Sequence, residues 1–222
     1  MTRGFVIRGG RIHGRIGEDE RHLLQGLCSA VIELLQTRDP GQDGTEPDPL
    51  AVLVGWQEDP GEPHDLALKW LLPSGITQPH DAEDSQEKAD AAADAAAEWR
   101  RLSESTVRQG KVATLRAAAL LLEPVELNLE ANQAEILAKA LNSIRLTLAA
   151  RIGLDSPEAM DTVFGQAEGA AEDPAARDAS DHDAENESLL ALFRLVAAIH
   201  DSLVMAMLEL LDLEPDPGEG AR

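Results

Sequence analysis

The stretch LNSIRLTLAARIGL, residues 141–154, decides the fold class of this chain. Together with the preceding ANQAEILAKA, it carries five large apolar side chains on one stripe at helical spacing: Leu137, Leu141, Ile144, Leu148 and Ile152. Gly153 suits the left-handed backbone conformation in which many helices end. We therefore predict an amphipathic helix from about Ala131 to Gly153.

Two other segments show the same periodicity. The first, LLQGLCSAVIELLQ, follows the acidic run Glu18 to Glu20, which favours a helix start, and it is expected to end near Gln36. The second is expected to form a helix from about Ser188 to Leu211. Its predicted inward face consists of Leu189, Phe193, Val196, His200, Leu203, Met207 and Leu210.

A long helix is also predicted between Asp84 and Leu122, because almost no helix breaker interrupts this segment. Gly110 is the position where a kink would fall. The residues expected to face inward are Trp99, Leu102, Thr106 and Ala113. The basic residues expected to flank that face are Arg100, Arg101, Arg108, Lys111 and Arg116.

A small amount of β-structure is expected near the N-terminus. Residues 5–16 contain Gly9 and Gly10, which can supply the positive φ angles of a two-residue hairpin turn and would place Ile7 opposite Ile12. Residues 125–129 alternate apolar and polar side chains, which predicts a short strand that pairs with this hairpin.

The segment between residues 39 and 81 is rich in Pro, Gly and acids, but it contains two short apolar runs. PLAVLVGW begins with Pro49, which suits a first helical turn. In the second run, Asp65 can cap a short helix from Leu66 to Leu72. Each run is expected to form a short helix.

The negative charge is concentrated in the connecting segments. The formal net charge is −22, and residues 39–98 contain 15 acidic and two basic residues, while residues 154–187 contain 11 and one. Residues 213–222 contain three and one, so the remainder of the chain has 15 basic and 12 acidic residues. The net charge therefore does not exclude a nucleic-acid or polymerase partner.

These patterns predict a mainly α fold. Aromatic residues make up 3% of the chain and tyrosine is absent, so the core must consist of Leu, Ile, Val and Ala, which suits packed helices. We expect one helical domain of about four major helices, made by residues 1–153 and 188–212, with a small N-terminal β-hairpin. Residues 154–187 are expected to form an acidic mobile insertion and residues 213–222 a disordered tail.

Cys28 is the single cysteine, so an intramolecular disulfide and a multi-cysteine metal site are excluded, and a reducing compartment is favoured. Its position near the apolar stripe of its helix favours a buried, inert thiol over a redox sensor. The N-terminus lacks a signal-peptide pattern, and no stretch approaches the roughly 20 apolar residues of a membrane helix. We expect a cytoplasmic protein without a membrane segment.

The sequence contains no recognisable catalytic motif. The six histidines share no metal-ligand spacing, and no phosphate-binding glycine loop or nucleophile motif occurs. We therefore expect no enzyme activity, no metal site and no cofactor, and we expect a protein that acts by binding.

The basic residues are the candidate binding groups. Those on the long helix, together with Arg3, Arg8, Arg11 and Arg15 near the hairpin, could contact phosphates or an acidic protein surface. Internal salt bridges to the acidic segments are the alternative, and the absence of a recognition-helix pattern or stacking aromatic residues favours that alternative.

Three segments in the same order carry a family resemblance: LLQGLCSAVIELLQTRDP, AAEWRRLSESTVRQGKVATL and LNSIRLTLAARIGL, the last followed by an amphipathic helix. Over nearly its whole length the chain resembles actinobacterial proteins catalogued as a domain of unknown function. Some members are described as oxidative-stress transcriptional regulators. The resemblance implies a cytosolic regulator that acts with RNA polymerase or a stress sigma factor and responds to thiol oxidation. With Cys28 alone, such a response needs an intermolecular disulfide or another thiol adduct.

Two functional hypotheses follow. The first is a transcription-regulatory protein that binds the transcription machinery, and DNA as a further candidate, through the basic residues of the long helix. The second is a protein-quality-control or metabolic adaptor without nucleic-acid contact, in which the apolar runs around Trp56 and Trp70 contact the partner.

Overall fold

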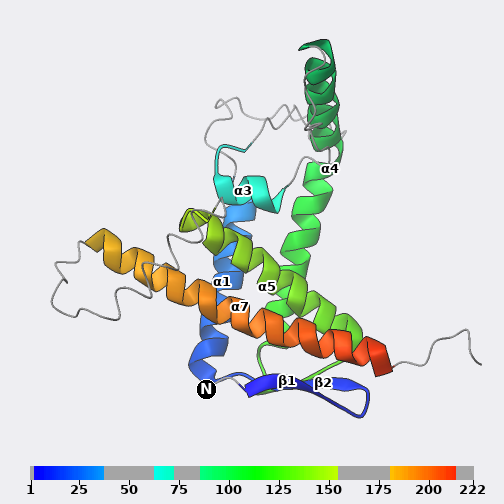
Figure 1. Cartoon of the computed structure of the whole chain (residues 1–222), viewed down its shortest axis with the longest axis vertical. Coiled ribbons are helices and arrows are strands. Elements are labelled where there is room, and N and C mark those ends of the chain that lie inside the picture. Colours follow the sequence, from blue (N-terminus) through cyan, green and yellow to red (C-terminus); the bar gives the residue numbers. More distant parts are fainter. Residues whose placement is uncertain (1–2, 38–62, 73–85, 155–180, 214–222) are drawn as a thin grey trace, which may run out of the picture.

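The computed structural model describes residues 3–37, 63–72, 86–154 and 181–213. Within these residues the chain is mainly α-helical with a small antiparallel sheet, as the sequence predicts (Figure 1). The helices are α1 (Glu18–Gln36), α3 (Leu66–Leu71), α4 (Gln86–Leu121), α5 (Ala131–Arg151) and α7 (Asp181–Leu213). The strands are β1 (Arg3–Arg8), β2 (Arg11–Arg15) and β3 (Glu126–Leu129).

The helices form two layers. α1 packs against α4, and α5 packs against α7 while also contacting α4, α3 and α1. In Figure 1, α5 and α7 run obliquely across α1 and α4, and the N-terminal half of α4 extends beyond the other helices. One apolar core joins these layers, and its fully buried side chains include Leu115, Leu137, Leu141, Ile144 and Leu203.

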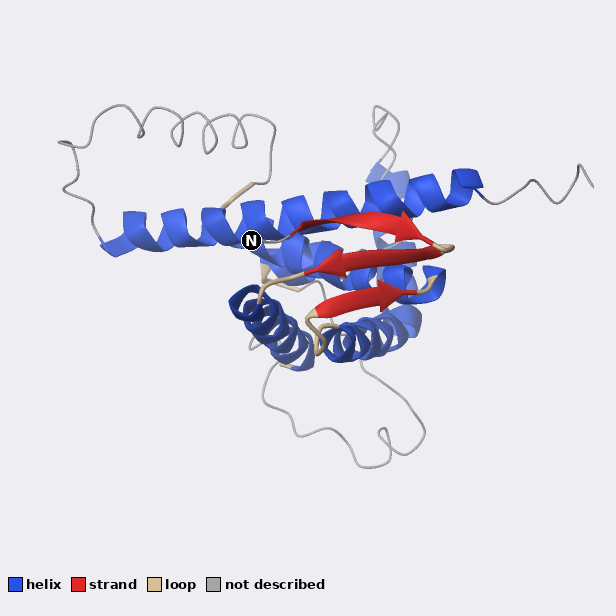
Figure 2. Ribbon diagram, turned by 90° about the horizontal axis from the view of Figure 1, so that it is seen from below, coloured by secondary structure: helices blue, strands red, loops and turns tan. Residues whose placement is uncertain are grey.

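The predicted hairpin and its partner strand are confirmed. Gly9 and Gly10 form the turn with φ angles of 59° and 73°, and Ile7 pairs with Ile12. β3 pairs with β2 on the other side, so the sheet order is β1-β2-β3. Figure 2 shows the sheet lying at one end of the helical layers, with α7 running alongside β1.

The predicted helix ends agree with the local chemistry. α1 has three acidic residues in its first turn, and Asp65 caps α3 by accepting a hydrogen bond from the Ala67 N–H at 2.8 Å. Gly153 lies just beyond the end of α5, and its φ of 72° allows the Leu154 N–H to reach the Ala149 carbonyl at 2.9 Å. The expected helix beginning at Pro49 lies outside the described residues.

The start of the last helix differs from the prediction. α7 begins at Asp181, so residues 181–187 belong to the helix and not to the acidic insertion expected from their composition. A run of polar and acidic residues next to an apolar helix can extend that helix, since Ala and Glu favour helix and acidic side chains favour its first turns.

The inward face of α4 is opposite to the predicted one. Trp99 and Leu102 are 52% and 62% exposed, and Thr106 and Ala113 are also exposed. The buried face instead contains Glu104, Val112, Leu115, Ala118 and Leu122. The reason is that α4 contacts α1 and α5 mainly through its C-terminal half, where Leu115 and Leu122 determine which side faces the core.

Candidate macromolecule-binding site

The basic residues of α4 do not form one exposed surface. Arg100 and Lys111 are partly buried, Arg116 is exposed, and the side chain of Arg101 lies outside the described residues. Arg108 is held by two partners, because its guanidinium donates to the Leu35 carbonyl at 2.5 Å and to Glu104 Oε1 at 2.6 Å. The structure therefore gives Arg108 a role in the packing of α4 against α1.

Lys111 lies on the same side of α4 as the buried residues. Its pKa is lowered from its usual value because partial burial disfavours the charged ammonium. Arg116 is the one member of this set that is fully available on the surface among the side chains described. The sequence-based proposal that the five residues act together is not favoured by this arrangement.

Two arginines join α1 and α4 at opposite ends. Arg21, 6% exposed, comes from the first turn of α1 and donates to the carbonyls of Leu122 and Glu123 at the end of α4. Arg108 makes the corresponding contact from α4 to Leu35 near the end of α1. Since helix C-termini carry partial negative charge, each guanidinium stabilises the end of the other helix.

Cys28 lies in the apolar core between α1 and its neighbours. It is 1% exposed, and burial raises the pKa of its thiol from 9.0 to about 11. A thiol that is both covered and protonated reacts slowly with oxidants and disulfides. The tentative redox residue therefore has the surroundings of a structural thiol.

This placement predicts slow thiol chemistry. In the native protein at neutral pH, Cys28 should react with Ellman's reagent at least about 100-fold more slowly than in the protein unfolded by guanidinium, because the higher pKa alone lowers the thiolate fraction about 100-fold. The release of nitrothiobenzoate, followed by absorbance, measures both rates. Equal rates would show that the thiol is accessible and would support the redox interpretation.

The basic residues near the hairpin are arranged differently from those of α4. Side chains alternate between the two faces of a strand, and the face pointing away from the helices contains Val6, Arg8, Arg11, His13 and Arg15, together with Glu126 and Asn128 of β3. We call this set the outer sheet face. Figure 2 looks onto it, and no described element covers it.

Arg11 is fixed in place on the outer sheet face. Its guanidinium donates to Asn128 Oδ1 at 2.6 Å, to the Asn128 carbonyl at 3.1 Å and to Glu130 Oε1 at 2.8 Å. These contacts bind β2 to β3 and hold the Arg11 guanidinium at the hairpin end of the face.

The register places like charges opposite each other on this face. Arg8 pairs with Arg11, whereas Arg15 lies opposite Glu126 of β3. Arg8 and Arg15 are exposed, and neither forms an ion pair with a described carboxylate. Directly opposed like charges destabilise a sheet, so packing alone does not account for this row of arginines.

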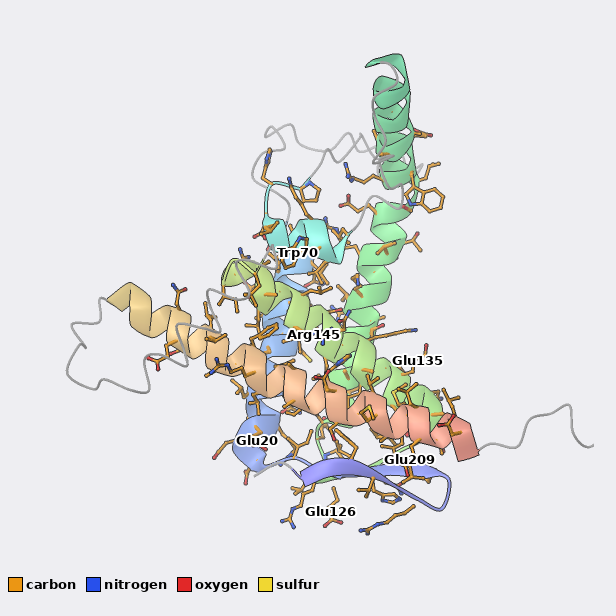
Figure 3. All side chains as sticks on the ribbon, viewed as in Figure 1. Glu20, Trp70, Glu126, Glu135, Arg145 and Glu209 are labelled. Atoms are coloured by element: carbon orange, nitrogen blue, oxygen red, sulfur yellow. The ribbon has the colours of Figure 1, made fainter. Side chains whose placement is uncertain are left out.

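The apolar segments of the adaptor hypothesis are only partly placed. Trp70 lies on α3 and is partly buried, while Trp56 lies outside the described residues. Figure 3 labels Trp70 on α3, at the far side of the molecule from the sheet. The described residues thus place Trp70 away from the outer sheet face.

Two further features concern metals and membranes. Within residues 3–37, 63–72, 86–154 and 181–213, no group of three or more His, Cys, Asp or Glu side chains is arranged to hold a metal ion. One helix, Asn186–Asp212, is long and apolar enough to cross a membrane by length and composition, with a mean hydropathy of 1.8. The core helix of a soluble protein can have the same length and composition, so the absence of a membrane segment stays a prediction from the sequence.

The fold and these surfaces define a mainly α-helical protein with a small sheet whose basic face is open. The chain belongs to the family described as Domain of unknown function (DUF2017), whose profile matches residues 2–207. This confirms the expected membership in a domain-of-unknown-function family. Comparisons with curated proteins and with solved structures found no match.

Proposed function

We propose that this protein is a cytoplasmic transcription-regulatory protein that acts by binding an acidic surface of the transcription machinery, on an RNA polymerase subunit or a sigma factor. The outer sheet face is the contact surface. The observation that carries the proposal is the row of arginines, in which Arg8 faces Arg11 across the hairpin and Arg15 is exposed at the other end of β2. An anionic partner removes the repulsion that this row imposes on the free protein.

The mixed charge of the outer sheet face favours an acidic protein over DNA. Glu126 lies opposite Arg15, and Glu130 is paired with Arg11, so carboxylates border the arginines on the β3 side. A phosphate backbone is uniformly negative and would be repelled by these carboxylates, whereas a protein surface can offer both signs of charge.

The direct test is affinity purification of the tagged full-length chain from its own cell lysate, followed by mass spectrometry, under reducing and under oxidising conditions. A polymerase subunit or a sigma factor is expected in the eluate. Because Cys28 is buried, the same partner is expected in both conditions. An eluate without any transcription protein would contradict the proposed function, and a partner seen only after oxidation would contradict the structural role of Cys28.

The adaptor function remains the second candidate, supported by the exposed apolar residues of α4. Trp99 is 52% exposed and Leu102 is 62% exposed. Exposed large apolar side chains often contact partners. Purification that recovers a protease or a metabolic enzyme in place of a transcription protein would favour this function.

A further inference from the structure

The C-terminal turns of α7 carry several large apolar side chains that are exposed on the surface. Met205, Leu208 and Leu211 are 66%, 52% and 64% exposed, although Leu203, Ala206 and Leu210 of the same turns are buried against the core. Only 28% of the most apolar window of this helix is buried. Three large apolar side chains within two turns of one helix are more than the scattered exposure that is normal for a surface.

Met205 and Leu208 border an open cleft between α7 and β1, and Leu211 lies one turn beyond Leu208 on α7 without lining it. The cleft has a volume of about 570 Å³, and its lining includes the buried residues Phe5 and Ala206 and the exposed residues Met205 and Leu208. The Ser202 hydroxyl accepts a hydrogen bond from the Phe5 N–H at 2.9 Å, which ties the strand to the helix at the base of the cleft. We call this feature the α7 cleft.

The rim of the α7 cleft is acidic. Glu209 and Asp212 line it, both are exposed, and the last turn of α7 contains no basic residue. A helix C-terminus carries partial negative charge and is stabilised by cations, so carboxylates at this end are unfavourable in the free protein. A cation supplied by a partner would offset both the carboxylates and the helix dipole.

We propose that the α7 cleft binds a cationic amphipathic helical segment of a partner protein, whose apolar face covers Met205, Leu208 and Leu211 while its Lys or Arg side chains pair with Glu209 and Asp212. A helix that lays its apolar face into a groove is a common mode of peptide recognition. This surface is separate from the outer sheet face, and its charge has the opposite sign.

The acidic rim also excludes the other occupants that an apolar helix face could have. A second copy of the chain packed through the same face would bring Glu209 and Asp212 of both copies together, and like charges across an interface oppose association. An anionic membrane surface would be repelled for the same reason. Charge complementarity therefore selects a cationic helix.

The test uses the full-length protein and two labelled peptides of about 16 residues made only of Leu and Lys, long enough to form a helix on binding. In one peptide, Leu recurs at helical spacing; in the other, the same residues are scrambled so that no apolar face forms. Fluorescence anisotropy gives the two affinities. We expect the protein to prefer the amphipathic peptide by at least about tenfold, because the apolar contacts depend on that spacing.

Variants assign the preference to the α7 cleft. The double change Met205→Ser with Leu208→Ser should abolish it, and Glu209→Gln with Asp212→Asn should weaken binding of both peptides and reduce the salt dependence. Leu120→Ser, which changes a leucine that is 65% exposed on α4, is the matched control and should leave the preference unchanged. Circular dichroism establishes that each variant is folded.

Four outcomes would overturn the proposal. The first is equal binding of the two peptides by the unchanged protein, and the second is a preference that survives Met205→Ser with Leu208→Ser. The third is a dimer, detected by sedimentation, that is lost in that variant, since a second copy would then occupy the cleft. The fourth is binding to phosphatidylserine vesicles that is lost in the same variant, which would assign the cleft to a membrane.

Discussion

Replacing both Arg8 and Arg15 with Glu should weaken binding of the transcription partner by about 100-fold or more, since each reversal places a like charge opposite the partner's carboxylates at a cost of at least about 1.4 kcal/mol. Both side chains are exposed, so the substitutions remove no packing contact described in the structure. The loss should come partly from slower association, because exposed interface charges steer encounter. Biolayer interferometry with the purified partner measures both rate constants.

The charge change itself requires a control. Arg116→Glu combined with Lys139→Glu alters the net charge by the same amount at exposed positions on α4 and α5, away from the sheet. This control should retain binding within a few-fold, because net charge alone acts only weakly at physiological salt. If the control loses as much affinity as the sheet variant, the outer sheet face is not the contact surface.

Arg21→Met should lower the free energy of unfolding by about 3 kcal/mol, since the Leu122 and Glu123 carbonyls at the end of α4 lose their donor while remaining close to the core. For a chain of this size the melting temperature should fall by about 10 °C. Methionine keeps much of the apolar stem of arginine, so the measured effect comes mainly from the loss of the guanidinium. Urea unfolding followed by circular dichroism measures the effect.

The matched control is Arg116→Met, which changes an exposed arginine of α4 and should cost less than about 0.5 kcal/mol. Arg108→Met should cost about as much as Arg21→Met, because it leaves the Leu35 carbonyl without its donor and the buried Glu104 carboxylate without its cation. An Arg21→Met variant as stable as the control would show that the contact between α1 and α4 does not depend on this arginine.

The elements that the sequence predicts correctly are those set by short-range patterns. Gly9 and Gly10 determine the hairpin register locally, and the α5 stripe was recognisable from the spacing of its Leu and Ile residues, of which Leu137, Leu141, Ile144 and Leu148 are buried. In α4 the apolar residues lie on two opposite sides, and the choice between them depends on contacts with α1 that are distant in sequence. Periodicity alone therefore favoured Trp99 and Leu102, which are exposed.

Only part of each candidate surface could be predicted from the sequence, because these surfaces also depend on contacts between residues that are distant in the chain. A count of basic residues on α4 could not reveal that Arg108 reaches Leu35, a residue far away in the chain. The hairpin arginines were recognisable as a set, but their common face follows only from strand pairing. Met205, Leu208 and Leu211 lie off the predicted inward stripe of α7, and this second apolar side was the available signal for the α7 cleft.

Site-specific photocrosslinking tests the central claim most directly, namely that the outer sheet face contacts the transcription machinery. Benzoylphenylalanine would replace His13, at the centre of that face, or Ala113, on the exposed side of α4. Irradiation in cells should link a polymerase subunit or a sigma factor to position 13 and not to position 113. A transcription protein linked at position 113 alone, or only nucleic acid linked at position 13, would contradict the claim.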